Sequence, residues 1–295
     1  MEEWIREYFK YYFTTDKSDL NLERANRIKD TNLNGELFCY KPYNKYTLDM
    51  LKNNHIWCAR MDTLNDPFEC SFNCAFYDDE YKNLKEKLSY PDDVIKYLAF
   101  LEVNNKDSLF SYQERMQTYS FSFTRTYQSP NLWWHYANKY KGICVSYRIK
   151  DIKAYNDGKL WQALHPVMYS DKIADLKPFI KLSPSKQNIN MLYYPALIKH
   201  TCWESENEVR VVLKGDPTKD GKGKIINVPK PYAVYAFKEH MKKTEFTNLQ
   251  KLLYKLDIPL FRLFAKDGEF GFERCLDESY KRYRIKTMNK KKETL

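Results

Sequence analysis

The spacing of apolar residues along the chain predicts a mixture of helices and strands. Trp4, Ile5, Tyr8, Phe9 and Tyr12 recur at the spacing of one helical face. In residues 119–124 aromatic and hydroxyl side chains alternate, which predicts a strand with one apolar and one polar face. Further helices are predicted at 46–53, 82–101 (with a break near 89–91), 132–138 and 245–256. Further strands are predicted at 37–41, 56–61, 143–147, 208–213 and 261–265. Residues 220–224 are predicted to form a hairpin-type turn.

The order of these elements predicts the fold class. Helices and strands mix without a regular βαβ repeat, which favours an α+β fold with a single mixed or antiparallel sheet and flanking helices. No internal repeat or linker divides the body. We therefore predict an N-terminal helical extension (1–35), an α+β domain (36–280) and a basic C-terminal tail (281–295).

Composition narrows the class of protein. Hydrophobic residues make up 43% of the chain and aromatic residues 16%, too many for a disordered protein. The apolar run 97–101 is far shorter than a membrane span, so no membrane partner is expected. The start of the chain lacks a signal-peptide pattern, and the seven cysteines are an odd, scattered set. These features predict a cytoplasmic location.

The net charge of +10 is concentrated at one end of the chain. Residues 281–295 hold seven lysines and arginines and one glutamate, or +6 of the total, which leaves +4 for the rest. A basic tail is either a solvated segment or a contact for nucleic acid. Nucleic acid is therefore a candidate partner of 281–295.

The strongest candidate chemistry is acidic. If the strand at 208–213 begins early, Glu204, Glu206, Glu208 and Arg210 share one face. Carboxylates so close together repel, which raises the pKa of at least one and is a known way to build a catalytic acid or base. The alternative is a solvated strand edge on which Arg210 pairs with a glutamate.

Two further groups of residues have both a functional and a structural interpretation. The hydroxyl groups of Ser120, Ser122 and Thr124 suit a ribose or phosphate, or the outer face of an ordinary strand. The run 133–136, Trp-Trp-His-Tyr, suits stacking on a base or nicotinamide, or buried packing. Cys70 and Cys74 lack the paired ligands of a zinc motif, so no metal is expected.

Four short segments are informative in combination. They are Phe38-Cys39-Tyr40-Lys41; Leu64-Asn65-Asp66-Pro67-Phe68-Glu69; Ser122 with Leu132-Trp133-Trp134-His135-Tyr136-Ala137 and Lys141-Gly142; and Lys199 with Trp203-Glu204-Ser205-Glu206-Asn207-Glu208-Val209-Arg210. In this order they resemble the bacterial family known as domain of unknown function 2971. The resemblance runs from about residue 37 to about residue 285. The resemblance implies no established activity. It implies that the protein is an effector encoded in phage-defence, toxin or mobile regions of a genome.

A looser similarity connects the same segments with ADP-ribosyltransferases and implies a split sheet and NAD as substrate. A carboxylate then stabilises the oxocarbenium-like ribose. The similarity assigns this role to Glu208, while Glu206 orients or deprotonates a protein or nucleic-acid acceptor and Ser122 holds the ribose. It assigns cofactor binding to Tyr40, Lys41, Trp133, Tyr136 and Arg210, with Tyr136 on nicotinamide and Lys41 or Arg210 on the pyrophosphate.

Two other functions stay open at this point. Asp66, Glu206, Glu208 and Arg210 are similar to a D…E-x-K metal-dependent nuclease site, although arginine cannot act as the titratable lysine. The run 133–136 and the basic tail suit a non-catalytic nucleic-acid-binding module, whose affinity would fall steeply with salt.

Overall fold

The computed structural model describes residues 2–278 and 280. The helices are α1 (Glu3–Tyr12), α2 (Leu22–Asn32), α3 (Lys45–Asn53), α4 (Tyr77–Lys87), α5 (Asp92–Gln117), α6 (Pro130–His135), α7 (Ile149–Ala154), α8 (Lys159–Gln162), α9 (Lys177–Ile180), α10 (Pro217–Asp220) and α11 (Lys243–Leu256). The strands are β1 (Glu36–Lys41), β2 (His55–Arg60), β3 (Phe72–Asn73), β4 (Thr118–Thr124), β5 (Ile143–Arg148), β6 (Leu164–Pro166), β7 (Met168–Tyr169), β8 (Ala174–Asp175), β9 (Ile198–Lys199), β10 (Glu208–Lys214), β11 (Gly223–Asn227), β12 (Ala233–Ala236), β13 (Leu260–Ala265) and β14 (Phe272–Leu276).

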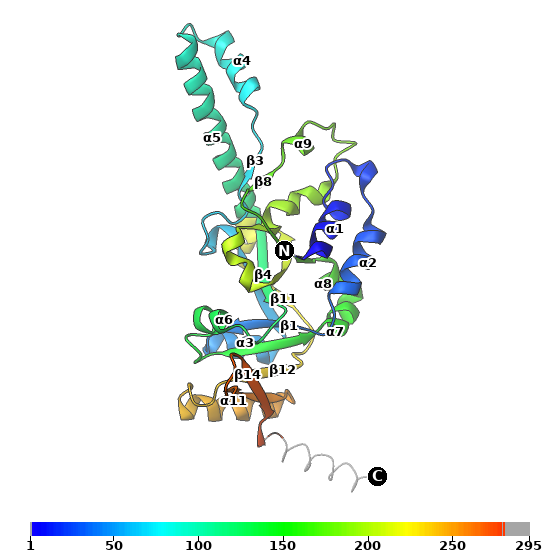
Figure 1. Ribbon diagram of the computed structural model, residues 1–295, viewed down its shortest axis with the longest axis vertical. Coiled ribbons are helices and arrows are strands. Elements are labelled where there is room, and N and C mark those ends of the chain that lie inside the picture. The colour runs from blue at the N-terminus through cyan, green and yellow to red at the C-terminus, as the bar shows by residue number, and fades with distance from the viewer. Residues whose placement is uncertain (1, 279, 281–295) are drawn as a thin grey trace.

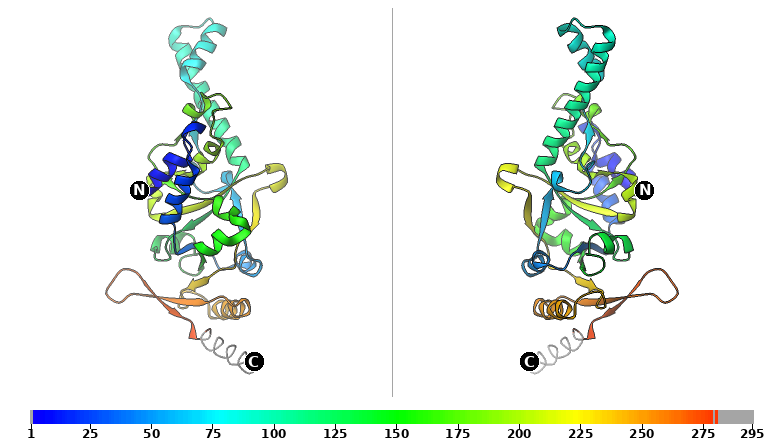
Figure 2. Two further views of the ribbon diagram at one scale, coloured as in Figure 1. Left: turned by 90° about the vertical axis from the view of Figure 1, so that its right-hand side faces the viewer. Right: turned by 90° about the vertical axis from the view of Figure 1, so that its left-hand side faces the viewer.

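The predicted fold class is confirmed: helices flank a mixed, open sheet (Figure 1). Within the described residues the main sheet has ten strands, with β12 and β13 paired in parallel and the other pairs antiparallel. The α4–α5 hairpin projects from one end of the body, and β13, β14 and α11 lie at the opposite end (Figures 1 and 2).

β4 is the branch point of the sheet. β10 pairs with all seven residues along one edge of β4. The other edge is shared, because Ala59 of β2 pairs with Ser120 and Phe38 of β1 pairs with Thr124. Among the described residues, 121–123 have no strand partner on this edge. We call this gap between β1 and β2 the notch.

The chain direction explains why the notch is open. β1 and β2 are both antiparallel to β4, so they are parallel to each other and α3 connects them. β1 leaves β4 after Phe38, and β2 joins it at Ala59. The intervening ends of both strands diverge from β4 and leave space at its edge.

Most predicted elements are confirmed within a few residues, including the break between α4 and α5. The hairpin predicted at 220–224 is wrong, because β11 pairs with β2 and not with the preceding β10. The polar face predicted for β4 is not a solvated face. Ser120 and Thr124 on it are buried, and Ser122 alone of the three is exposed.

The N-terminal segment is helical, as predicted, and forms part of the packed body. Tyr8 of α1 is fully buried, and its hydroxyl lies 2.7 Å from Nδ1 of His165. Lys29 of α2 is also buried and donates to the carbonyl groups of Trp161 and Leu164. The helices α1 and α2 therefore share a core with the residues around β6, and the predicted tail at 281–295 lies outside the described residues.

Two further expectations concern the environment of the protein. All seven cysteines are free thiols, and five of them are buried. Among the described residues, no helix combines the length and the apolar character that crossing a bilayer requires.

Gly142, between α6 and β5, packs against the main chain of β1. Its N–H donates to the Ala137 carbonyl at 2.7 Å, and an added Cβ would lie well inside van der Waals distance of the Lys41 carbonyl oxygen. Gly142→Ala is therefore expected to lower the free energy of unfolding by about 2 kcal/mol, because overpacking against rigid neighbours costs this much. Urea unfolding at pH 7 measures the change.

Gly35→Ala is the matched control. Gly35 has a φ of +75° and no neighbour within 4 Å of an added Cβ. Its replacement should cost about 1 kcal/mol for the left-handed backbone alone. A loss at Gly142 no larger than the loss at Gly35 would contradict the close packing of this loop on β1.

Candidate active site

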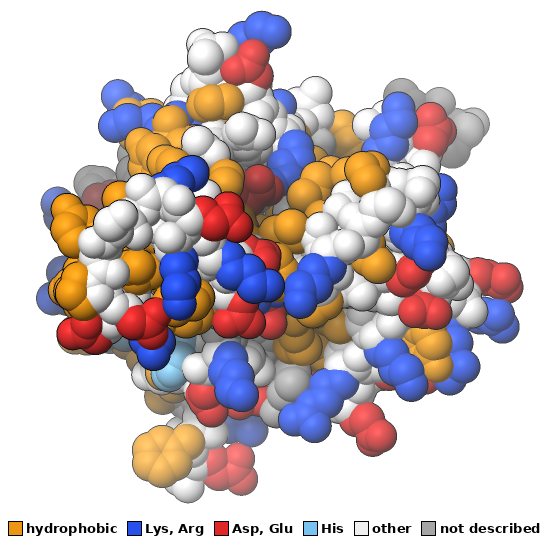
Figure 3. All heavy atoms as spheres, turned by 90° about the horizontal axis from the view of Figure 1, so that it is seen from above, with side chains coloured by type: hydrophobic (Ala, Val, Ile, Leu, Met, Phe, Trp, Pro, Cys, Tyr) orange, Lys and Arg blue, Asp and Glu red, His pale blue; other side chains and the backbone are white. Residues whose placement is uncertain are grey.

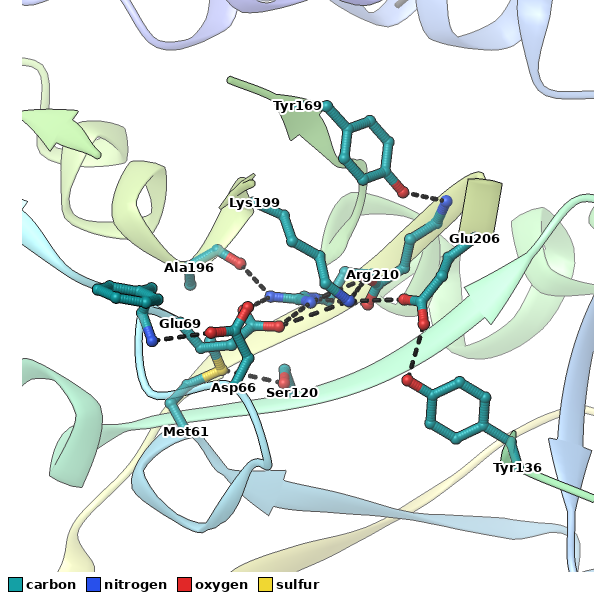
Figure 4. A network of polar contacts seen from close by, with 12 residues as sticks. Met61, Asp66, Glu69, Ser120, Tyr136, Tyr169, Ala196, Lys199, Glu206 and Arg210 are labelled. Carbon is teal, nitrogen blue, oxygen red and sulfur yellow. Dashed lines mark hydrogen bonds and ion pairs between the residues drawn. The ribbon is translucent and has the colours of Figure 1, made fainter. Parts of the chain in front are cut away.

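A buried ionic network around Arg210 lies beside the notch (Figure 4). The guanidinium of Arg210 uses all five of its N–H groups: two bonds to Glu208, two to Glu69 and one to the Ala196 carbonyl, at 2.7–3.0 Å. Arg210 as a whole is only 1% exposed. Both carboxylates bind it with two oxygens, the geometry that favours arginine over lysine.

Lys199 extends the network toward Tyr136. Its ammonium group donates to Glu206 at 2.6 Å and to Glu208 at 3.1 Å, and it lies 3.6 Å from Glu69. The other oxygen of Glu206 accepts the Tyr136 hydroxyl at 2.7 Å. The network thus joins three glutamate side chains to two basic side chains, so its formal charge is negative.

The mutual pairing keeps the buried groups ionised. Burial alone would raise the pKa of Glu208, but Arg210 and Lys199 lower it to about 2. Burial also opposes the charge of Lys199, yet Glu208 and the other glutamates raise its pKa. Burial acts in the same direction on Arg210, and Glu208 and Glu69 nevertheless hold its pKa well above the usual range.

The backbone between Glu206 and Glu208 brings both carboxylates to Lys199. Residues Thr201–Glu206 form a 3₁₀ helix, and Asn207 has a left-handed φ of +48° that turns the chain into β10. The expected strand face shared by Glu204, Glu206 and Glu208 is therefore wrong. Glu204 is exposed on the 3₁₀ helix and does not line the cavity at the notch.

The turn at residues 65–69 positions Glu69. Asp66 accepts the N–H of Phe68 at 2.9 Å, and its carbonyl accepts the N–H of Glu69. This Asx turn places the buried Glu69 carboxylate on Arg210. Asp66 thus shapes the loop, and Glu69 belongs to the network.

The notch contains a cavity of about 280 Å³, which we call the network cavity. Glu206, Glu208, Arg210 and Lys199 line one side, and Ser122 lies on the exposed edge of β4. A larger cavity of about 620 Å³, around Tyr155 and Lys159, has no acidic or histidine side chain in its lining. The network cavity is the better site because ionisable groups converge there.

One polar atom in the network cavity lacks a partner. Thr124 is 5% exposed, and its Oγ1 forms no hydrogen bond with the described residues. Thr124 lines the cavity together with Ser122. The Ser122 hydroxyl contributes to lowering the pKa of Glu208. Since buried polar groups are almost always satisfied, the Thr124 hydroxyl is available to a bound molecule.

The aromatic residues predicted to bind a cofactor divide into two groups. Tyr136 lines the network cavity, and burial together with Glu206 raises the pKa of its hydroxyl. Trp133 is fully buried, donates to the Tyr127 carbonyl at 2.8 Å and packs edge-on against Tyr40. The prediction that Trp133 contacts a ligand is corrected accordingly: it supports the wall behind the cavity.

Two predicted phosphate contacts have different surroundings. Arg210 has no free N–H, so it cannot bind a pyrophosphate without breaking the network. Lys41 lines the cavity with its ammonium 4.2 Å from the Phe121 ring centroid, and within the described residues no hydrogen bond or ion pair holds it. Tyr40 also lines the cavity, but its hydroxyl donates to the Thr126 carbonyl.

Sequence reasoning missed Glu69, Lys199 and Tyr169 as site residues. Tyr169 accepts the N–H of Glu208 at 2.9 Å and thereby fixes the start of β10. Glu69 and Lys199 stand inside the motifs quoted above, and this placement was the available signal. Their contacts with Arg210 and Glu208 depend on tertiary packing.

Comparison with known proteins bears on the same segment. Residues 132–211 match the model of a family described as "Protein of unknown function (DUF2971)", which confirms the resemblance over this stretch. The stretch includes Tyr136, Lys199, Glu206, Glu208 and Arg210, and the description assigns no activity. No curated protein and no solved structure matches the chain.

The network predicts a specific dependence of stability on Glu208. Glu208→Gln removes the charged acceptor of two buried Arg210 hydrogen bonds and one Lys199 hydrogen bond, so it should lower the free energy of unfolding by about 3–5 kcal/mol at pH 7. Folding lowers the pKa of Glu208 from 4.5 to about 2. Its contribution is therefore complete above about pH 5 and is lost as the pH falls toward 2.

Urea unfolding of both proteins between pH 7 and pH 3 tests this dependence. The gap between wild type and Glu208→Gln should narrow as the pH falls. Glu239→Gln, at an exposed position outside the network, is the control and should follow wild type throughout. A gap that is constant with pH would show that Glu208 is not held ionised by its two cations.

Proposed function

We propose that the chain cleaves the bond between nicotinamide and ribose in NAD, as an NAD glycohydrolase or an ADP-ribosyltransferase-like enzyme. The observation that carries the proposal is convergence: Ser122, Tyr136, Glu206 and Glu208 come from three separate segments and line one cavity. By consuming NAD, such an enzyme would act as an effector, in keeping with the phage-defence or toxin role that the family resemblance implies.

The two glutamates of the E-x-E segment differ in what they offer a substrate. Both oxygens of Glu208 are bound by Arg210, and one also by Lys199. Glu206 has one bond to each oxygen, which leaves acceptor capacity on both. We therefore assign ribose contact to Glu206, with Glu208 adding negative charge behind it. This moves the ribose contact expected of Glu208 to Glu206, which keeps its expected role toward the acceptor.

The proposed step uses these charges directly. The bond between C1′ of the ribose and N1 of the pyridinium breaks, and its electron pair leaves with neutral nicotinamide. Positive charge then develops on the ribose, where preorganised carboxylates stabilise it. A water molecule, or a hydroxyl of a protein or nucleic-acid acceptor, bonds to C1′ and passes its proton to Glu206. The products are nicotinamide and ADP-ribose, or nicotinamide and the ADP-ribosylated acceptor.

Other residues that line the network cavity suit the nicotinamide ring, its carboxamide and the adjoining ribose of NAD. Tyr136 and the apolar side chains of Phe38 and Leu132 offer a surface for the nicotinamide ring. Ser122 and the unpartnered hydroxyl of Thr124 offer hydrogen bonds to the ribose or the carboxamide. This mixture of apolar walls and a few polar groups is typical of small-molecule sites.

The nuclease alternative is less compatible with the contacts. It requires Asp66, Glu206 and Glu208 to share a divalent cation, but Asp66 caps the Phe68 N–H and Glu208 is bound by two buried cations. Among the described residues, no cluster of three or more His, Cys, Asp or Glu side chains is arranged to hold a metal ion.

The nucleic-acid-binding alternative has little support in the described residues. The tail 281–295 lies outside them, and Trp133 is buried. On the face seen in Figure 3, the Lys and Arg side chains are interspersed with Asp and Glu. A binding surface for a polyanion would gather charge of one sign.

The proposal predicts a loss of NAD cleavage in Glu206→Gln. The variant keeps the size of the side chain but removes its charge, so the rate of nicotinamide release should fall at least 100-fold, as for loss of a transition-state stabilising group. Tyr136→Phe, which removes the hydroxyl bound to Glu206, should cause a smaller loss. Chromatography of free nicotinamide, with purified protein and NAD, measures the rates.

Glu204→Gln is the matched control, since Glu204 stands two residues earlier and does not line the cavity. It should cleave NAD at the wild-type rate, and thermal unfolding should show every variant folded at the assay temperature. Absence of cleavage by wild type with water, protein and nucleic-acid acceptors would overturn the proposal. So would equal rates in wild type and Glu206→Gln.

A further inference from the structure

A second cavity opens at the other side of the notch, against α3. Its volume is about 630 Å³, and it shares Lys41, Trp57 and Phe121 with the network cavity. We call it the α3 cavity. The network cavity, at about 280 Å³, falls below the roughly 300–1,000 Å³ typical of small-molecule sites, whereas the two together fall within it. A molecule with two parts could therefore occupy both.

The walls of the α3 cavity carry exposed aromatic rings. Tyr46 is 72% exposed and Trp57 is 51% exposed. Both line the cavity, on α3 and β2 respectively. Exposed aromatic rings beside a cavity are typical surfaces for stacking with planar heterocycles.

Polar groups beside these rings can read the edge of a heterocycle. Asn44 accepts the Thr47 N–H through Oδ1, and its amide nitrogen donates to no described residue. His55 and the half-exposed Asp49 form a pair at 3.4 Å on the same wall. These residues supply both donors and acceptors at the cavity surface.

The junction of the two cavities is cationic. The Lys41 ammonium lies over the Phe121 ring, and no acidic side chain among the described residues pairs with it. Burial lowers the pKa of Lys41, and the Cys39 and Cys58 thiols offset this only in part. An anion at the junction would provide the missing partner for this amine.

We infer that the α3 cavity is a second subsite that binds the nucleobase of a nucleotide, with Tyr46 and Trp57 stacking on the base and Lys41 contacting the phosphate at the junction. The identity of the full ligand rests on the proposed function. In NAD, the adenosine half would occupy the α3 cavity, the pyrophosphate would lie at Lys41, and the nicotinamide half would lie in the network cavity.

Calorimetric titration with AMP and with adenosine tests the subsite without requiring catalysis. AMP should bind wild type, and Trp57→Ala should weaken it at least 10-fold, in line with the cost of losing one stacked base. Tyr46→Ala should also weaken AMP binding, by a smaller factor, and its highly exposed position means that folding is not threatened. Lys41→Met should weaken the binding of AMP but leave the binding of adenosine unchanged, because adenosine has no phosphate.

Trp134→Ala is the matched control. Trp134 is 50% exposed, like Trp57, but lines neither cavity, so its replacement should not change AMP binding. If Trp57→Ala does not fold, Trp57→Phe takes its place. It keeps a ring at the position and should retain most of the affinity for AMP.

The outcomes separate the subsite from the proposed reaction. AMP binding that depends on Trp57 and Tyr46, without any NAD cleavage, would support the subsite and remove the proposed function. NAD cleavage together with AMP binding that is absent, or equal in wild type, Trp57→Ala and Tyr46→Ala, would overturn the subsite and leave the proposed function standing.

Discussion

The arrangement of this site depends on the desolvated guanidinium of Arg210. A buried charge is tolerated when it is paired and all of its hydrogen-bonding groups are used, and Arg210 meets both conditions. Its partners come from the loop before β3, from the segment before β9 and from β10 itself. One side chain therefore fixes three segments that are distant in the sequence. Glu208, held in this way, in turn positions Lys199 beside Glu206.

The branching of the sheet at β4 places this network beside an opening. β10 occupies one edge of β4 completely, whereas β1 and β2 cover only the two ends of the other edge. The space between them connects an acidic region at Glu206 with the ammonium of Lys41, which pairs with no carboxylate among the described residues. Such a polarity suits a substrate whose reacting end becomes positive and whose middle carries phosphate. Fold and chemistry are linked because β4 lines the opening and also pairs with β10, which carries Glu208 and Arg210.

Local patterns predicted the strongly periodic elements but not the pairing between them. The four-residue β12 was missed, and so was β14, which has Glu273 and Arg274 in its interior, because short or charged strands have weak patterns of their own. The hairpin at 220–224 failed since the partner of β11 is β2, far away in the chain. Glu206 and Glu208 do converge, but a left-handed Asn207 causes this and not the alternation of a strand. Glu69 could be associated with Arg210 only through the fold.

A structure of Glu206→Gln with NAD bound tests the central claim most directly, because the variant should hold the substrate without cleaving it. The account predicts the nicotinamide ring beside Tyr136 and residue 206, the pyrophosphate at Lys41 and the adenine ring against Trp57. Arg210 should keep its contacts with Glu69 and Glu208. NAD bound away from the notch, or no bound NAD at saturating concentration, would contradict the account.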